Sequence, residues 1–408
     1  MVELLSPAGN YEKMTFAFKY GADAVYISGK QFGMRAQADN FTLEEINDAL
    51  KFAHSLGKKI YVTVNIMPRT NMYPELREYL KNLASLSCGP VDGLIISDPG
   101  VFMLAKEICK ESELHVSTQA GCVSAADCIF WYSMGAKRVV LARELSLEEI
   151  KEIRREIPKD LEIETFVHGS MCVSFSGRCL LSSYLTGRDG NLGECAQPCR
   201  WNFTIQEETR PGEYMPIEQT DHGTFIMSSK DMNMSAHIKD LVDSGISSLK
   251  IEGRMKSAYY TAVVTNVYRA AIDGYLKDGD GYVFDERWQK ELDSVSHREY
   301  CTGYYYDNPM KNPQLCTEGG YIRDKAYLAI AKGYDKEKKM GIFIQKNKMK
   351  AGDECELVSP GKFGVRIKAS YILDENDNEI ESTPHPYMVF KIPCENEVKE
   401  GDILRSAY

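Results

Sequence analysis

The feature that most constrains the fold is a short pattern that occurs four times in the chain of 408 residues. In each copy a glycine and a short polar link precede a run of aliphatic or β-branched residues. The copies span Tyr20–Ser28, Gly89–Ser97, Met134–Ala142 and Ser244–Glu252. A glycine in front of such a run is typical of a helix that ends and a buried strand that begins. The pattern therefore predicts buried strands that each follow a helix.

Helical patterns lie between these runs. Residues 42–57 open with a capping box formed by Thr42 and Glu45, and residues 146–157 open in the same way. Further strands are predicted at residues 2–7, 59–65, 113–119, 162–169 and 225–231. The alternation of short apolar strands with helices indicates βαβ units and a parallel sheet. Eight or nine strands before residue 255 favour a closed (β/α)8 barrel over an open doubly wound sheet.

The pattern changes near residue 318. Residues 258–276 and 285–296 read as helices that close the barrel domain, and after them short strands alternate with turn residues. We therefore predict a first domain over residues 1–317, with an inserted cysteine-rich segment at 164–201. A small antiparallel β-barrel is predicted over residues 318–408.

Charge limits the classes of function. The formal net charge of −10 argues against a protein that coats nucleic acid without specificity, because phosphate binding depends on Lys and Arg. Within residues 336–350, however, six lysines accompany one acidic residue, which indicates either a solvated hairpin or an edge that contacts phosphate. No apolar run is long enough to cross a bilayer, and the first residues do not resemble a secretory signal. We expect a cytoplasmic protein that does not bind membranes.

Four of the twelve cysteines gather in one short segment. Cys172, Cys179, Cys195 and Cys199 follow the predicted strand at 162–169 with the spacing C-x6-C-x15-C-x3-C. In a reducing compartment, clustered thiols are more often metal ligands or catalytic groups than disulfides. The spacing favours an iron–sulfur cluster, because structural zinc sites usually contain C-x2-C pairs. Zinc, or a nucleophilic cysteine with His168 as its base, remain alternatives.

Polar residues stand at the carboxyl ends of the predicted strands, where the active sites of (β/α)8 barrels lie. They are Ser28, Asn65, Ser97, Asp98, Thr118, Gln119, Arg143, Glu144, His168, Lys230, Asp231, Lys250, Glu252 and Arg254. The cysteine segment follows one of these strands and should lie on the same rim. The sequence contains no H-E-x-x-H, G-x-S-x-G or Walker A motif.

The segment around the first two cysteines carries a recognisable signature. Glu164–Ser182 matches E-x-F-x2-G-[SA]-[LIVM]-C-x4-G-x-C-x-[LIVM]-S at every position. This resembles the signature of the collagenase-like peptidase family U32. Residues 3–10, 33–42, 193–201 and 248–257 are similar to the same family, so the resemblance covers nearly the whole chain.

The resemblance implies RNA hydroxylation more than proteolysis. Better-understood branches of the family look like hydroxylases with a [4Fe–4S] cluster on four cysteines. The branch most similar in layout forms 5-hydroxyuridine at the tRNA wobble position and requires prephenate. In some members a ligand cysteine follows an S-K-D motif. Here no cysteine directly follows Ser229–Asp231, so Cys199 is expected as the fourth ligand beside Cys172, Cys179 and Cys195. The implied partners are a tRNA anticodon loop, prephenate or a related acidic molecule, and a homologous second subunit or a homodimer.

We assign expected roles to residues on the predicted rim. The expected catalytic residues are Gln119, His168, Lys250 and Glu252. The expected phosphate- or substrate-binding residues are Arg35, Arg178, Arg188 and Arg254. Two alternatives stay open: a collagenase-like peptidase, and a non-catalytic RNA-binding partner whose metal site is structural.

Overall fold

The computed structural model describes residues 2–35, 38–172, 174–201, 204–205, 215–216, 229–307 and 321–407. The chain divides into two compact units. The first contains residues 1–18, 22–256 and 298–320, and the second contains residues 19–21, 257–297 and 321–408. The predicted domain boundary at residues 317 and 318 lies outside the described residues.

The first unit is built on a closed barrel of eight parallel strands, as the alternating pattern predicts. The strands are β1 (Glu3–Pro7), β2 (Ala24–Ser28), β3 (Lys59–Val64), β4 (Gly93–Ile96), β5 (Glu113–Val116), β6 (Arg138–Val140), β7 (Glu162–Ser170) and β11 (Ser248–Ile251). Neighbours in the chain pair in parallel from β1 to β7, and β11 pairs with both β1 and β7. This double pairing closes the barrel, and the prediction of a (β/α)8 barrel is confirmed.

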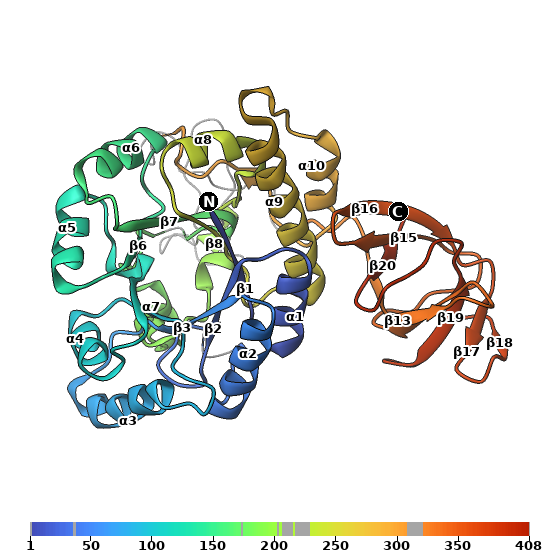
Figure 1. The fold of residues 1–408 in the computed structure, drawn as a ribbon, viewed down its shortest axis with the longest axis horizontal. Coiled ribbons are helices and arrows are strands. Elements are labelled where there is room, and N and C mark those ends of the chain that lie inside the picture. Colours follow the sequence, from blue (N-terminus) through green and yellow to red (C-terminus); the bar gives the residue numbers. More distant parts are fainter. Residues whose placement is uncertain are drawn as a thin grey trace. The chain divides into compact units, whose positions relative to one another are not determined.

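Helices surround the strands (Figure 1). They are α1 (Tyr11–Lys19), α2 (Leu43–Ser55), α3 (Tyr73–Ala84), α4 (Pro99–Ile108), α5 (Ala125–Met134), α6 (Leu147–Glu156) and α8 (Ile238–Asp243). Both predicted capping boxes are present, at Thr42 before α2 and at Ser146 before α6. In each box the side chain of the capping residue and that of a glutamate satisfy two backbone N–H groups at the start of the helix.

One predicted strand has a different place. Of the predicted strand at 225–231, only Ser229–Asp231 is described, and β10 (Asp231–Asn233) pairs antiparallel with the end of β7. The first part of β7 already pairs with β11, so only its last residues are available to β10. β12 (Tyr300–Cys301) extends this edge, and a buried ion pair of 2.8 Å between Arg298 and Asp231 fastens it.

The barrel interior contains a buried network of charges. Glu164 of β7, which is fully buried, accepts hydrogen bonds from Lys250 Nζ at 2.7 Å and from Arg138 Nη1 at 3.0 Å. Arg138 also binds Glu3 and Glu162, at the first residues of β1 and β7. Burial by itself opposes ionisation of Glu164, but Lys250 and Arg138 hold the pKa of its carboxyl at about 2. The network therefore links strands β1, β6, β7 and β11 from inside.

The second unit combines two helices with an antiparallel sheet. The helices are α9 (Ala258–Asp278) and α10 (Glu286–Asp293). The strands are β13 (Tyr327–Asp335), β14 (Met340–Gln345), β15 (Glu354–Ser359), β16 (Lys362–Lys368), β17 (Ile372–Asp374), β18 (Glu379–Ile380), β19 (Val389–Pro393) and β20 (Ile403–Ser406), in the sheet order β16-β15-β20-β13-β14-β19-β17-β18. Buried Arg405 of β20 binds Glu291 of α10 at 2.7 Å and Glu356 of β15 at 2.8 Å, so an ion-pair network joins helices and sheet within this unit. Among the described helices none is long and apolar enough to cross a bilayer.

We predict that Glu164→Gln destabilises the barrel by about 3–5 kcal/mol, because it leaves the buried Lys250 and Arg138 without their shared counter-charge. Glu162→Gln is the matched control, since Glu162 binds the same Arg138 but has a side chain that is 28% exposed. We expect it to cost less than about 1 kcal/mol. Urea unfolding of both variants at neutral pH measures the difference, and equal losses would contradict the interpretation.

The same ion pair has a pH dependence. The folded-state pKa of Glu164 is about 2, below the roughly 4.3 of an unfolded chain. Its contribution to stability is therefore complete above about pH 4.3 and is lost as the pH falls toward 2. We expect the stability gap between wild type and Glu164→Gln to narrow over this range in urea titrations. A gap that stays constant from pH 6 to pH 3 would contradict this assignment.

Candidate thiol-lined active site

The four clustered cysteines line one pocket. The pocket encloses about 100 Å³ and is lined by Cys172, Cys179, Cys195 and Cys199 together with Arg35, Arg143, Gln119 and residues around them. Cys172 is the second residue after β7, and the other three lie in the segment that contains α7 (Leu181–Thr186) and two short 3-10 turns. The segment thus lies at the carboxyl end of the barrel, as expected.

Close backbone contacts fasten the cysteine segment to loops that follow other strands. Gly177 has φ +74°, and a Cβ built on it would lie 2.1 Å from the carbonyl oxygen of Gln119, after β5. Gly193 has φ +89°, and its Cβ would lie 2.7 Å from the carbonyl oxygen of Gly33, after β2. Both positions require glycine, because only a residue without a side chain allows this backbone conformation and this approach.

Hydrogen bonds add two further attachments. The Glu144 carboxylate, after β6, accepts from the backbone N–H of Ser176 at 2.9 Å and from its hydroxyl at 3.1 Å. The backbone N–H of Met67, after β3, donates to the carbonyl oxygen of Asn191 at 3.1 Å. The segment therefore depends on the ends of four barrel strands for its shape.

The four cysteines of the pocket are not joined in disulfides. Cys172 is exposed and the other three are half-buried, so reagents and ligands can reach them. In the part of the chain that the structure describes, no three His, Cys, Asp or Glu side chains converge as they do around a single metal ion. The four cysteines nevertheless line the same pocket.

Of the predicted site residues outside the cysteines, the pocket brings together Gln119 and Arg35. Gln119 lies in the 3-10 turn Thr118–Ala120 after β5. Arg35 adopts a left-handed backbone with φ 71°, and Phe32 and Asn40 nearby do the same. Such conformations cost non-glycine residues about 1–3 kcal/mol each and persist where the surrounding structure imposes them.

Three predicted catalytic residues are not in the lining of this pocket. Lys250 is 3% exposed and lies inside the barrel, where its Nζ is 4.6 Å from the centroid of the Tyr26 ring. Burial lowers the pKa of Lys250, although Glu164 opposes the shift. His168 is buried on β7, and its carbonyl oxygen accepts a hydrogen bond of 2.8 Å from the backbone N–H of Glu252. Their catalytic roles stay predictions.

The other predicted arginines differ in their surroundings. Arg178 is exposed and Arg188 is half-buried, and neither is in the pocket lining. Arg254 is 4% exposed and donates from Nη2 to the carbonyl oxygen of Met34, which does line the pocket. Burial, together with the charge of nearby Arg35, lowers the pKa of Arg254 to about 10. Arg254 thus holds the backbone of Met34, the residue before Arg35 in the pocket lining.

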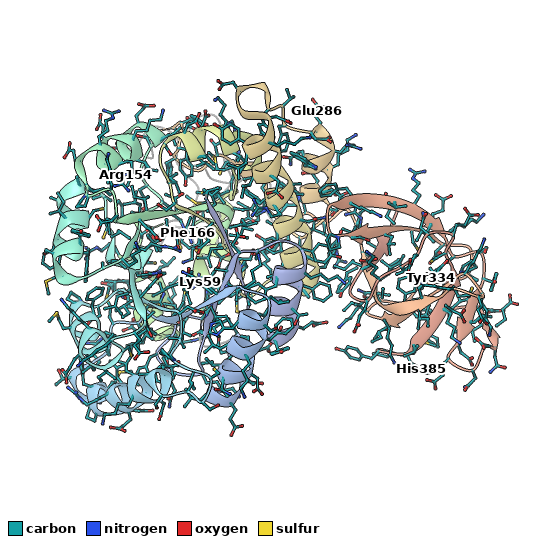
Figure 2. All side chains as sticks on the ribbon, viewed as in Figure 1. Lys59, Arg154, Phe166, Glu286, Tyr334 and His385 are labelled. Atoms are coloured by element: carbon teal, nitrogen blue, oxygen red, sulfur yellow. The ribbon has the colours of Figure 1, made fainter. Side chains whose placement is uncertain are left out.

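Sequence reasoning gave no role to Arg143, which lines the pocket. Its position after a buried strand was visible in the sequence. Its two structural partners were not, because Phe166 and Ser170 lie on another strand. The guanidinium carbon of Arg143 stands 3.9 Å from the centroid of the Phe166 ring, and Phe166 lies inside the ring of helices (Figure 2).

The fold and the pocket define a (β/α)8-barrel protein with a thiol-lined site at the carboxyl ends of its strands. Residues 9–314 match the profile of Peptidase family U32, and residues 323–405 match the Peptidase family U32 C-terminal domain. The chain belongs to peptidase family U32, and the resemblance seen in the signature is confirmed.

Relatives of the chain carry different names. Over 403 residues it is 38% identical to tRNA hydroxylation protein P1 of Bacillus subtilis, and this alignment covers 99% of this chain and 94% of that protein. It is 36% identical over 277 residues to a 23S rRNA 5-hydroxycytidine synthase of Escherichia coli, covering 68% of this chain and 40% of that protein. It is also 32% identical over 420 residues to a collagenase of Porphyromonas gingivalis, covering 98% and 97%.

We predict that Gly177→Ala loosens the cysteine segment, because the new methyl group meets the Gln119 carbonyl oxygen. Gly187→Ala is the matched control: Gly187 has a similar φ of +69°, but a Cβ there has nothing within 4 Å. Both variants bear a strain of about 1–2 kcal/mol from the left-handed backbone. Only Gly177→Ala should also speed the reaction of the pocket thiols with a thiol reagent in cofactor-free protein. Equal rates in the two variants would contradict the docking role of Gly177.

Proposed function

We propose that the protein is an RNA-modifying hydroxylase that forms 5-hydroxyuridine at the wobble position of tRNA, with a [4Fe–4S] cluster on Cys172, Cys179, Cys195 and Cys199. The observation that carries the proposal is the pocket in which these four thiols meet Gln119 and Arg35 at the carboxyl end of the barrel. The relatives named for hydroxylation of tRNA and rRNA support the reaction class.

The donor set fits an iron–sulfur cluster better than a single ion. Four cysteine thiolates are the usual ligands of such clusters, and a cubane accepts sulfurs farther apart than zinc does. All four cysteines line one pocket. When bound, the cluster supplies one-electron redox chemistry at the barrel mouth.

The residues of the chain bind and orient the substrate. A base must leave its stack before an enzyme can act on its ring, and the unpaired bases of an anticodon loop are suited to this. The Gln119 side-chain amide can donate to and accept from the edge of such a base. The Arg35 guanidinium offers a fork for phosphate oxygens or for an acidic co-substrate such as prephenate. Replacing C5–H of uridine by C5–OH is a two-electron oxidation, so the reaction also consumes an oxygen-atom source and a two-electron oxidant.

We predict that serine at any one of Cys172, Cys179, Cys195 or Cys199 lowers cluster content and abolishes the modification. Anaerobically purified wild type should contain about four iron and four sulfide per chain. Cys88→Ser is the control, since Cys88 is a half-buried free thiol that is not in the pocket lining. Nucleoside mass spectrometry of tRNA from cells that carry only the variant measures 5-hydroxyuridine. Full modification in any of the four pocket variants would refute the ligand set.

The relative named collagenase favours a second candidate, a peptidase. A thiol with a base could attack a peptide carbonyl, and His168 lies on the strand that leads to Cys172. The two candidates make opposite predictions for purified protein. A hydroxylase leaves gelatin intact and contains iron, whereas a peptidase digests gelatin and loses that activity in Cys172→Ser.

A further inference from the structure

Arg143 carries an N–H group that the described residues leave without an acceptor. Its Nη1 donates to the carbonyl oxygen of Ser170 at 2.9 Å, and its guanidinium lies over the Phe166 ring. The Nε atom is buried and has no hydrogen-bond acceptor among the described residues. A buried N–H without an acceptor costs about 1–3 kcal/mol, and more when the group is charged. Native structures keep such a group mainly where a ligand or water completes it.

The charge of Arg143 also lacks a counter-ion within the described part of the chain. Glu144, the next residue, uses its carboxylate on Ser176. Glu164, on the strand that carries Phe166, binds Lys250 and Arg138. The carboxylates of both residues are thus engaged with groups other than Arg143.

The pocket has a second guanidinium. Arg35 lines the same cavity of about 100 Å³. Two arginines on one small cavity create a positive potential that favours an anionic group over a neutral one. An oxygen anion of planar or tetrahedral shape, a carboxylate or a phosphate, matches the two-point fork that arginine presents.

We propose that Arg143 is the anion receptor of the pocket and that its guanidinium group binds a carboxylate or phosphate group of the incoming molecule. The anion could come from an RNA phosphate or from the carboxylate of an acidic co-substrate, and the choice of these two sources rests on the proposed function. The receptor role itself rests only on the contacts of Arg143.

The surroundings of Arg143 hold it in a binding orientation before a ligand arrives. Phe166 is 8% exposed and provides a rigid face against which the planar guanidinium stacks. Ser170, near the end of β7, fixes one end of the group through its backbone. A receptor already held in place loses little conformational entropy on binding. Lysine would keep the charge but would lose both the stacking and the fork.

The experiment compares Arg143→Gln, Arg143→Lys and a control, Arg155→Gln, in the cluster-containing protein. Arg155 is an exposed arginine on α6. Equilibrium binding is measured with two probes: an anticodon stem-loop RNA with a wobble uridine, and prephenate. Iron and sulfide content and the melting temperature are measured for each variant, so that a folding or cluster defect is separated from a binding defect.

We expect Arg143→Gln to weaken binding of one probe by about 10- to 100-fold, as for the loss of a charge-assisted hydrogen bond. Arg143→Lys should recover only part of the loss, and Arg155→Gln should bind as wild type does. A loss confined to the RNA identifies a phosphate, and a loss confined to prephenate identifies a carboxylate. Unchanged binding of both probes in folded Arg143→Gln would overturn the proposal. If Arg143→Gln does not fold, Arg143→Lys decides: wild-type binding of both probes by that variant would overturn the fork as the receptor.

These measurements are separate from the test of the proposed function. Hydroxylation is read from tRNA nucleosides, whereas the receptor role is read from binding to purified protein. A protein that binds either probe through Arg143 but makes no 5-hydroxyuridine would refute the hydroxylase and keep the receptor. A protein that hydroxylates tRNA and whose Arg143→Gln variant binds both probes normally would refute the receptor and keep the hydroxylase.

Discussion

The barrel depends on the closure made by β11. This strand pairs in parallel with the first strand, β1, and with β7, so the sheet has no free edge between them. Lys250 of β11 and Glu164 of β7 meet inside the barrel, and Arg138 of β6 joins them. A buried charge that loses its partner is strongly destabilising, so the network disfavours other arrangements of these strands. Everything at the carboxyl ends of the strands is positioned by this closed ring.

The cysteine segment takes its shape from the ring and not from regular structure of its own. Its helix α7 spans only Leu181–Thr186. Gly177, Gly193 and Ser176 instead attach it to loops after β5, β2 and β6. A segment held at several points by a rigid scaffold can present four thiols, with little motion, to the cavity that Arg35 and Arg143 also line. The chemistry proposed for the pocket therefore relies on the barrel in which the pocket is seated.

Much of the fold can be predicted from local signals. The glycines before apolar runs locate the strands, and Thr42 and Ser146 locate the starts of two helices, because these signals act over a few neighbouring residues. The antiparallel pairing of β10 could not be predicted, since it depends on which part of β7 remains open after β11 has paired. The placement of Lys250 inside the barrel was equally hidden. Its position in a strand is local, but its partner Glu164 is 86 residues away in sequence.

The candidate site shows the same division. Clustering in sequence was enough to group the four cysteines, and strand-end position was enough to select Gln119. Arg143 had the same strand-end signal, but its value as a ligand-binding group comes from Phe166 and Ser170. Two contacts with another strand decide whether an arginine at a strand end faces a pocket or solvent. The sequence alone does not show these contacts between strands.

Strand β7 and the residues just after it contribute to both the charge network and the thiol pocket. Glu164 belongs to the charge network, Phe166 supports Arg143, Ser170 accepts from Arg143, and Cys172 opens the thiol segment. Strand β7 and the two residues after it thus connect the charge network in the barrel interior to the thiol pocket at the carboxyl end. The fixed number of residues between the glutamate and the first cysteine of the family signature then has a structural reason. Side chains alternate between the two faces of a strand, so adding or removing one residue would turn the side chains on one side of the change away from their partners.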